Sequence, residues 1–298
     1  MKFLIHKRFF LYILLIFVFQ GTAKAGGNGV WAGAEEITSL PPQQRVVIDT
    51  RSSWNFLLGH IPGAINLNDW RDFTQKVNSV RGLLNRDKHW IATELGSLGI
   101  SPDKTLFIYG DPEDKWRTDG RFFWMFEYYG FKKIKLLKGG ITGWKKSGQP
   151  VERGPATSKK HPPLNAQDIV FNPEILADSE WIAARLDSEQ ITIIDNREQE
   201  EYDGRTPYGS PRGGHIPGAI HIDWRDFFDS RGELKSAGDL ATLISQYRIP
   251  KNREVVVYCT GGVRSGMAYA VFRHLGYRVR NYDGSWWDWS HNPSLPVD

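Results

Sequence analysis

Cysteine is almost absent from this sequence of 298 residues, in which Cys259 is the single example. One thiol cannot close an intramolecular disulfide, and it excludes any metal site built from several cysteines. Excess charge is scarce as well. Four of the 38 basic residues and none of the 34 acidic residues lie in residues 1–25, so the rest of the chain is neutral. A neutral body argues against a protein that binds nucleic acid through its phosphates.

Long hydrophobic runs are missing too. The run Phe9–Phe19 is shorter than the roughly 20 apolar residues that a membrane-spanning helix needs. It follows three basic residues and precedes Ala23-Lys24-Ala25. This order predicts a secretory signal peptide over residues 1–25, cleaved after Ala25, with an uncleaved anchor as the alternative. We therefore expect a periplasmic or secreted protein that has no stable membrane insertion after cleavage.

The sequence does contain enough apolar material for a folded protein. Hydrophobic residues make up 40% of the chain and charged residues 24%. Those fractions exclude a disordered or fibrous chain. At roughly 150 residues per domain, the length indicates two domains, each able to bury a core of its own.

Five segments of the first half recur in the second half in the same order. Val46–Arg51 recurs as Thr192–Arg197, His60–Ile65 as His215–Ile220, Asp69–Phe73 as Asp223–Phe227, Leu106–Tyr109 as Val255–Tyr258, and the pair Gly139 and Trp144 as Gly284 and Trp289. Five blocks in one order indicate a domain duplication. The two domains are predicted over residues 26–150 and 167–298. A linker over residues 151–166, rich in glycine, proline, serine and lysine, is predicted between them.

Each half alternates short apolar runs with longer helical patterns. The runs are typical of buried strands, and the helical patterns before Gly130 and Gly276 end at those glycines. Such alternation predicts an α/β fold in which a mostly parallel sheet carries helices on both faces. Ligands of these sheets bind beyond the carboxyl ends of the strands. Cys259 lies there, directly after the predicted strand Val255–Tyr258.

The segment after that strand favours a reactive thiol. Gly261 and Gly262 follow Cys259 closely, and a helix is predicted from Gly266. Adjacent glycines let successive N–H groups point inward, and the helix adds its positive end, so the loop stabilises a thiolate. Such settings lower a cysteine pKa from about 8.5 to roughly 3.5–7.5. A buried inert cysteine is the alternative, but this position favours a nucleophile.

These segments resemble the tandem-domain rhodaneses, a family of sulfurtransferases. The resemblance rests on the Asp-x-Arg of each half, the two Gly-His-Ile-Pro-Gly-Ala stretches that begin at Gly59 and Gly214, the Cys259 loop, and Asp283–Trp286. It implies two rhodanese-like α/β domains, of which the second carries the catalytic cysteine. The first copy has Gly110 in place of Cys259. We therefore interpret the first domain as a non-catalytic scaffold that walls the cleft.

The resemblance also implies the reaction. A small anionic sulfur donor passes its outer sulfur to Cys259, and a thiophilic acceptor such as cyanide or a thiol removes it, in a ping-pong reaction through a covalent intermediate. The loop N–H groups are expected to bind the donor and to stabilise charge on its terminal sulfur. These groups belong to Thr260, Gly261, Gly262, Val263 and Arg264. Neither a metal nor an organic cofactor is expected, and protein partners are unknown.

Side-chain cations for the donor are expected in an insertion of the second copy. This insertion, between Arg197 and His215, contains Arg205 and Arg212. Tandem members of the family place substrate-binding arginines in this stretch, so both residues are predicted to bind the donor. Arginine suits a planar anion because it donates two parallel hydrogen bonds. Two solvated loop charges are the alternative.

Other conspicuous side chains are given mostly structural roles. His60 and His215 recur in both copies, including the copy without a thiol, so we expect them to hold turns. Asp195 and Arg197 are expected to pair at the end of a strand. The tryptophans of the last segment either line the cleft or pack in the core; they are Trp286, Trp287 and Trp289.

The loop matches neither of the two best-known subgroups of the family. Thiosulfate enzymes often have Cys-Arg-Lys-Gly-Val-Thr, and mercaptopyruvate enzymes Cys-Gly-Ser-Gly-Val-Thr. The absence of that serine and the charge of Arg264 favour thiosulfate as donor, with 3-mercaptopyruvate as the alternative. Two other classes are weighed: a cysteine phosphatase or arsenate reductase, whose loop is one residue longer, and a non-enzymatic sulfur carrier.

Overall fold

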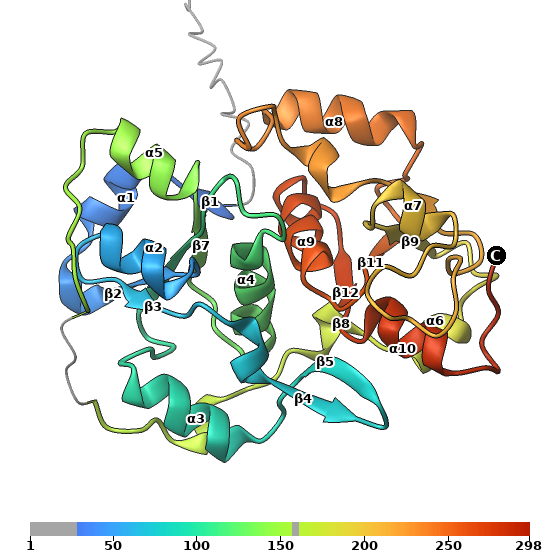
Figure 1. Cartoon of the computed structure of the whole chain (residues 1–298), viewed down its shortest axis with the longest axis horizontal. Helices are drawn as coiled ribbons and strands as arrows, with labels where there is room; N and C mark the ends of the chain where they lie inside the picture. The colour runs from blue at the N-terminus through green and yellow to red at the C-terminus, as the bar shows by residue number, and fades with distance from the viewer. Residues whose placement is uncertain (1–28, 157–160) are drawn as a thin grey trace, which may run out of the picture.

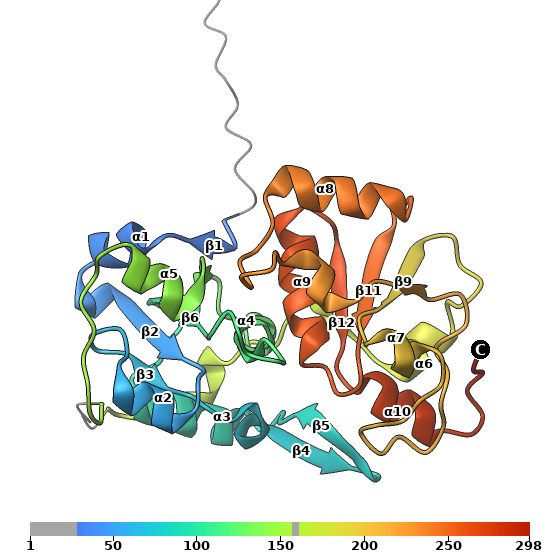
Figure 2. The ribbon, with the colours of Figure 1, turned by 45° about the horizontal axis from the view of Figure 1, so that its top comes forward.

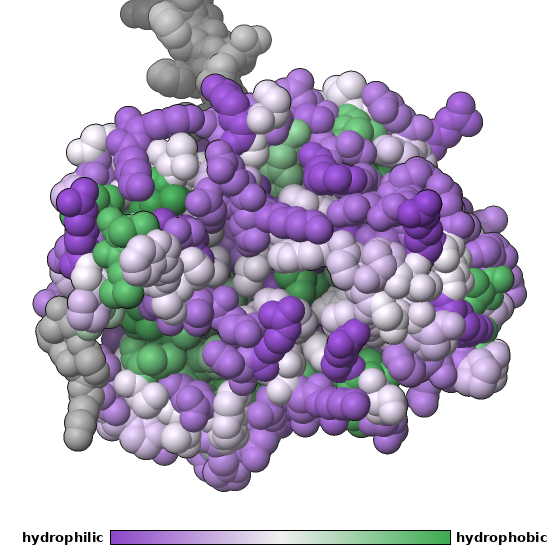
Figure 3. All heavy atoms as spheres, in the orientation of Figure 1, coloured by the Kyte–Doolittle hydropathy of each residue, from purple (hydrophilic) through white to green (hydrophobic). Residues whose placement is uncertain are grey.

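The structure, a computed structural model, describes residues 29–156 and 161–298. The predicted signal peptide lies outside the described residues. Two α/β units lie side by side, one from each half of the chain (Figure 1). Hydrophilic side chains cover most of the face in Figure 3, where hydrophobic ones form separate patches. Within the described ranges, no helix is long and apolar enough to cross a bilayer.

The first domain is built on a five-stranded parallel sheet with the order β1-β7-β6-β2-β3. Its elements are β1 (Trp31–Ala32), α1 (Ala34–Ser39), η1 (Pro42–Gln44), β2 (Arg45–Asp49), α2 (Ser53–Leu58), β3 (Ile65–Asn66), η2 (Trp70–Phe73), β4 (Thr74–Val77), β5 (Val80–Leu84), α3 (Lys88–Ser97), β6 (Thr105–Tyr109), α4 (Thr118–Tyr128), β7 (Ile134–Leu137) and α5 (Gly140–Lys146). The apolar runs of β2 and β6 lie at the centre, where both faces are buried.

The second domain repeats this arrangement as β8-β12-β11-β9-β10, again with all strands parallel. Its elements are β8 (Leu176–Ala177), α6 (Ser179–Ala183), β9 (Ile191–Asp195), α7 (Gln199–Tyr202), β10 (Ile220–His221), η5 (Trp224–Phe227), α8 (Ala237–Gln246), β11 (Glu254–Tyr258), α9 (Arg264–His274), β12 (Val279–Tyr282) and α10 (Ser285–His291). Helices cover both faces of each sheet, as predicted (Figure 2).

The sequence repeat is a structural repeat down to individual hydrogen bonds. Arg197 pairs with Asp195 at 2.6 Å, and Tyr258 donates to the same carboxylate at 2.7 Å. The first domain holds the same network, with Arg51 2.6 Å from Asp49. The predicted pairing at the strand ends is therefore confirmed.

Both repeated histidines hold turns, as expected. His60 Nδ1 contacts the Phe56 carbonyl at 2.9 Å, and His215 Nδ1 contacts the Tyr202 carbonyl at 3.1 Å. Each imidazole also stacks on the ring of its partner at 3.7 Å. These contacts give both imidazole rings a structural role.

The segment between the domains follows the first domain closely. Leu164 N–H donates to the Ala92 carbonyl at 3.1 Å, and Asn172 N–H donates to the Tyr128 carbonyl at 2.8 Å. Two short helical turns lie in this stretch, η3 (Ala166–Asp168) and η4 (Pro173–Ile175). The first strand of the second domain, β8, begins only at Leu176, later than the residue 167 predicted for that domain.

The antiparallel hairpin β4–β5 distinguishes the first copy from the second. The second copy has only one bridge at this place, between Phe228 and Leu234. The hairpin extends from the first domain toward α10 of the second (Figures 1 and 2). It therefore places residues of the first domain beside the carboxyl edge of the other sheet.

Helices α4 and α9 form the centre of the contact between the domains. They hold matching places in the two copies and lie side by side in both ribbon views (Figures 1 and 2). Gly120 and Gly266 permit the close approach, because a Cβ on Gly120 would lie 2.4 Å from the Cα of Met267. One hydrophobic core, with Phe122 and Met267 among its members, runs through both domains around this helix pair.

Candidate active site

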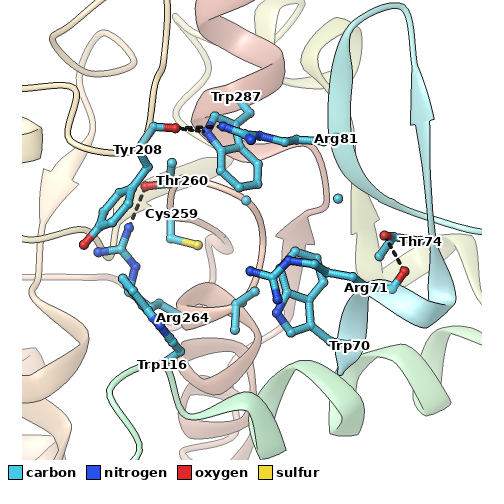
Figure 4. Close-up of a pocket in the computed structure, with 13 residues that line it drawn as sticks. Trp70, Arg71, Thr74, Arg81, Trp116, Tyr208, Cys259, Thr260, Arg264 and Trp287 are labelled. Atoms are coloured by element: carbon cyan, nitrogen blue, oxygen red, sulfur yellow. Dashed lines mark hydrogen bonds between the residues drawn. The ribbon is translucent and has the colours of Figure 1, made fainter. Parts of the chain in front are cut away.

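Cys259 follows β11, the middle strand of the second sheet, and lies at its carboxyl edge. Only 1% of the residue is exposed. Its N–H donates to the hydroxyl of Ser285 at 3.2 Å, and its carbonyl accepts the N–H of Trp286 at 3.0 Å. The main chain of the cysteine is thus held on the side of α10, and its sulfur points into a cavity (Figure 4).

The loop after Cys259 has the geometry of an anion cradle. Gly262 has a φ of +77°, and Val263 returns to right-handed backbone angles just before α9 begins. Alternation of this kind turns successive N–H groups to one side of the loop. The hydroxyl of Ser265, in the first turn of α9, lies 3.6 Å from the Cys259 sulfur.

The electrostatics of this loop favour a thiolate. Burial by itself raises the pKa of Cys259, because a charged sulfur loses its hydration. The Arg264 guanidinium and hydrogen bonds from Ser265 and the Gly261 N–H outweigh that effect, so the pKa of the thiol lies below its ordinary value. A buried cysteine with a lowered pKa is a reactive group, unlike an inert core cysteine.

Arg264 forms an ion pair with Glu201, a residue of α7 that the sequence pattern did not indicate. The two side chains pair through hydrogen bonds of 2.6 and 2.9 Å, and each is about 2% exposed. Thr260 donates its hydroxyl to the same carboxylate. Burial raises the pKa of Glu201, but the charge and hydrogen bonds of Arg264 and the hydrogen bond from Thr260 outweigh this effect. The pKa therefore lies below its ordinary value, and the carboxyl keeps its charge. Glu201 therefore partly neutralises the charge of Arg264.

A cavity of about 410 Å³ opens above Cys259, between the two domains. Its lining residues are Trp70, Arg71, Thr74, Arg81, Gly82 and Trp116 from the first domain, and Tyr208, Cys259, Thr260, Gly261, Val263, Arg264 and Trp287 from the second. Arg71 reaches toward the sulfur in Figure 4. Cations and aromatic rings together make a site for a small anion with a thiol at its base.

The family model of the rhodanese-like domain matches residues 34–147 and 178–292. The chain belongs to the rhodanese family of sulfurtransferases. The family and the two rhodanese-like domains predicted from the sequence are thereby confirmed. A thiosulfate sulfurtransferase of Azotobacter vinelandii is 30% identical over 261 residues, which cover 87% of this chain and 93% of that protein.

Two further relatives are named for other activities than thiosulfate sulfur transfer. Sulfur carrier protein TtuD of Thermus thermophilus is 32% identical over 252 residues, covering 80% of this chain and 85% of that protein. The crystal structure of SseA from Escherichia coli, a 3-mercaptopyruvate sulfotransferase, is similar with a TM-score of 0.74 at 26% identity. That match covers 86% of this chain and 98% of SseA.

The predicted loop residues of this rhodanese are gathered around the sulfur, with one exception. Thr260, Gly261, Val263 and Arg264 line the cavity together with Cys259. Gly262 belongs to the loop but does not line the cavity, since its carbonyl is turned to the first domain.

Neither arginine predicted from the insertion is placed in the cavity. The Arg205 side chain is 78% exposed and lies 3.6 Å from Glu200. Arg212 donates to four main-chain carbonyls at the end of the chain, those of Trp289, Ser290, Asn292 and Leu295. It therefore fastens the C-terminal segment. The insertion reaches the cavity through Tyr208 instead.

Besides Arg264, the cations that line the cavity come from the rhodanese domain without a thiol. Arg81 of β5 lies 4.3 Å from the Trp287 ring and donates to the Tyr208 carbonyl at 2.9 Å. Arg71 of η2 lies 4.9 Å from the Trp70 ring. The sequence offered one signal for Arg71, the repeated Asp-Trp-Arg-Asp-Phe motif, and none for Arg81.

The three tryptophans near the end of the chain divide between the two expected roles. Trp287 lines the cavity. Trp286 and Trp289 are 1% and 0% exposed and belong to the core of the second domain. In the described part of the chain, no three His, Cys, Asp or Glu side chains come together in a group that could hold a metal ion.

Proposed function

We propose that this rhodanese is a thiosulfate sulfurtransferase that carries the transferred sulfur as a persulfide on Cys259. The observation that carries the proposal is the position of this thiol, with its lowered pKa, at the base of a cavity lined by three arginines. Arg71, Arg81 and Arg264 supply positive charge for an anionic donor.

The geometry supports a double displacement. The Cys259 thiolate attacks the outer sulfur of thiosulfate, the sulfur–sulfur bond of the donor breaks, and sulfite leaves with the bonding electron pair. Charge on the sulfur in transit is stabilised by the loop N–H groups and the positive end of α9. A nucleophilic acceptor then attacks the outer sulfur of the persulfide, and the thiolate is restored. With cyanide the product is thiocyanate.

A second donor is favoured by one specific contact. The Ser265 hydroxyl lies 3.6 Å from the Cys259 sulfur, where it can assist a proton transfer to or from the thiol. The similarity to SseA agrees with 3-mercaptopyruvate, whose carboxylate also suits the arginines. Thiosulfate remains the first proposal because three cations line a small cavity.

Intact mass spectrometry tests the persulfide. Mixing the protein with thiosulfate should add one sulfur atom, and subsequent cyanide should remove it with formation of thiocyanate. The Cys259→Ser variant should gain no sulfur. A higher kcat/KM with 3-mercaptopyruvate than with thiosulfate would reverse the order of the two donors. Phosphate release from an aryl phosphate without any thiocyanate formation would refute sulfur transfer.

Efficient turnover separates the enzyme from a sulfur carrier. The similarity to TtuD makes a carrier the relevant comparison. A carrier would hold the persulfide on Cys259 but release it slowly to cyanide, dithiothreitol and other small thiols. We expect steady turnover with at least one of these acceptors.

We also propose export of the protein. The support is the order of basic residues, apolar run and small residues within residues 1–25. Fractionation of the producing cell, followed by N-terminal sequencing, tests this. A mature protein that begins at Gly26 in the periplasm or medium is expected, whereas an intact Met1 in the cytoplasm would contradict export.

A further inference from the structure

Arg121 connects the first domain to the loop that carries Cys259. It belongs to α4 and is 0% exposed. Its guanidinium donates to the carbonyl of Gly262 at 3.2 Å and to the carbonyl of Gly82 at 2.8 Å. It also lies 2.9 Å from a carboxylate oxygen of Asp283. One side chain thus joins the β4–β5 hairpin, the catalytic loop and the end of β12.

The crossing of α4 and α9 brings Arg121 to this position. A Cβ on Gly266 would lie 2.8 Å from the Cα of Arg121, so the two helices touch main chain to main chain there. Gly120 and Gly266 occupy matching places in the repeat. The residue after this glycine is Arg121 in the first copy and Met267 in the second. The fold of the repeat therefore does not itself require an arginine.

The Gly262 carbonyl determines which way the loop faces. It accepts from Arg121 and, at 3.5 Å, from the amide of Asn281. In a trans peptide the C=O and N–H point in opposite directions. Holding this carbonyl on Arg121 therefore turns the N–H of Val263 to the opposite side of the loop. Space on the Arg121 side is closed, since a Cβ on Gly262 would lie 2.5 Å from its guanidinium.

We propose that Arg121 is a positioning residue through which the first domain holds the Cys259 loop in its anion-binding conformation. It touches neither the sulfur nor the cavity and acts through the Gly262 carbonyl. The inference rests on the proposed use of Cys259 as the nucleophile. It gives the domain without a thiol a part in catalysis beyond walling the cleft.

The rate of Cys259 alkylation by iodoacetamide, measured against pH, tests this proposal without any sulfur donor. Arg121→Met introduces the residue that the second copy holds at Met267. We expect the midpoint of the profile to move up by about one pH unit, so that alkylation slows about tenfold at pH values below both midpoints. Arg121→Lys keeps the charge but loses the double hydrogen bond, and we expect an intermediate shift.

Tyr269→Phe is the matched control. It removes a 2.8 Å hydrogen bond from Tyr269 to Glu127 across the same helix pair, away from the loop. This variant should lose some thermal stability while its alkylation midpoint stays at the wild-type value. An equal shift in Tyr269→Phe would mean that any interface damage disturbs the thiol, and the proposal would be wrong.

The lysine variant decides two remaining outcomes. A wild-type profile in Arg121→Lys would show that charge alone matters, and it would overturn a positioning role. If Arg121→Met does not fold, the shift in Arg121→Lys carries the test. Failure of the wild-type protein to transfer sulfur would refute the proposed function but would leave these alkylation profiles interpretable.

Discussion

At the scale of single residues, Cys259 is a group that burial alone would keep neutral. Its pKa falls because a cation and several hydrogen-bond donors surround it. Arg264 is the largest of these favourable influences, and Glu201 restrains it by forming a buried pair with it. The reactivity of the thiol therefore depends on two opposite charges.

These charges give two predictions of opposite sign. Arg264→Gln removes the cation and should raise the pKa of Cys259 by about one unit or more, so that alkylation slows about tenfold or more at pH values below both midpoints. Glu201→Gln removes the anion and should lower that pKa further. The pH profile of iodoacetamide alkylation measures both shifts. Movement of both midpoints in one direction would contradict this account.

Each of these variants leaves one buried charge without its partner. Removing one member of a buried pair typically costs about 3–5 kcal/mol of stability. The double variant Arg264→Gln and Glu201→Gln is therefore the control. It should recover part of the lost stability in a urea melt, while its alkylation profile keeps an upward shift that is smaller than that of Arg264→Gln.

At the scale of elements, the β4–β5 hairpin and η2 of the first domain add Arg81 and Arg71 to the Arg264 that the second domain supplies to the cavity. We expect Arg71→Met and Arg81→Met each to raise KM for thiosulfate about tenfold, because each removes a charged hydrogen-bond donor worth about 1.5–3 kcal/mol. Steady-state kinetics with cyanide as acceptor measures this. kcat should change less, since neither side chain contacts the sulfur of Cys259.

Arg205→Met is the informative comparison for these kinetics. The sequence pattern predicted that Arg205 binds the donor, whereas the structure places its side chain in solvent beside Glu200. The structure therefore predicts an unchanged KM for thiosulfate. A rise equal to that of Arg71→Met would restore the prediction made from the sequence.

The crossing of α4 and α9 predicts an effect on stability. Gly120→Ala places a methyl group 2.4 Å from the Cα of Met267, and helix main chain cannot move aside easily. We expect a loss of about 1–3 kcal/mol in the free energy of unfolding. Gly238→Ala in α8 is the control, since its nearest neighbour is a serine hydroxyl at 3.7 Å. That exchange should stabilise the protein slightly.

At the scale of the whole molecule, the two domains share one hydrophobic core. Phe122 of the first domain and Met267 of the second belong to the same buried cluster, and the helices that carry them touch. Interfaces between domains ordinarily resemble the more polar interfaces of transient complexes, and they do not share a core in this way. We therefore expect a single cooperative unfolding transition by scanning calorimetry. Two resolved transitions would show that the domains unfold separately.

Much of the architecture was predictable because it depends on residues that are contiguous in the sequence. The duplicated strand and turn motifs, the strand before Cys259, its two glycines and the following helix all depend on local preferences. The pairing of Asp195 with Arg197 is local as well, since the two residues are two positions apart. The sequence by itself therefore determined the doubled parallel sheet and the place of the thiol.

The tertiary structure alone decided which charges other than that of Arg264 surround that thiol. Arg81 and the Tyr208 carbonyl that it contacts are 127 residues apart, and Arg121 and Gly262 are 141 apart. No local pattern encodes such contacts, because they arise only when the two domains pack along α4 and α9. Arg205 and Arg212 illustrate the same limit. Their spacing agreed with the family, but the fold of their loop directs one to solvent and the other to the C-terminal segment.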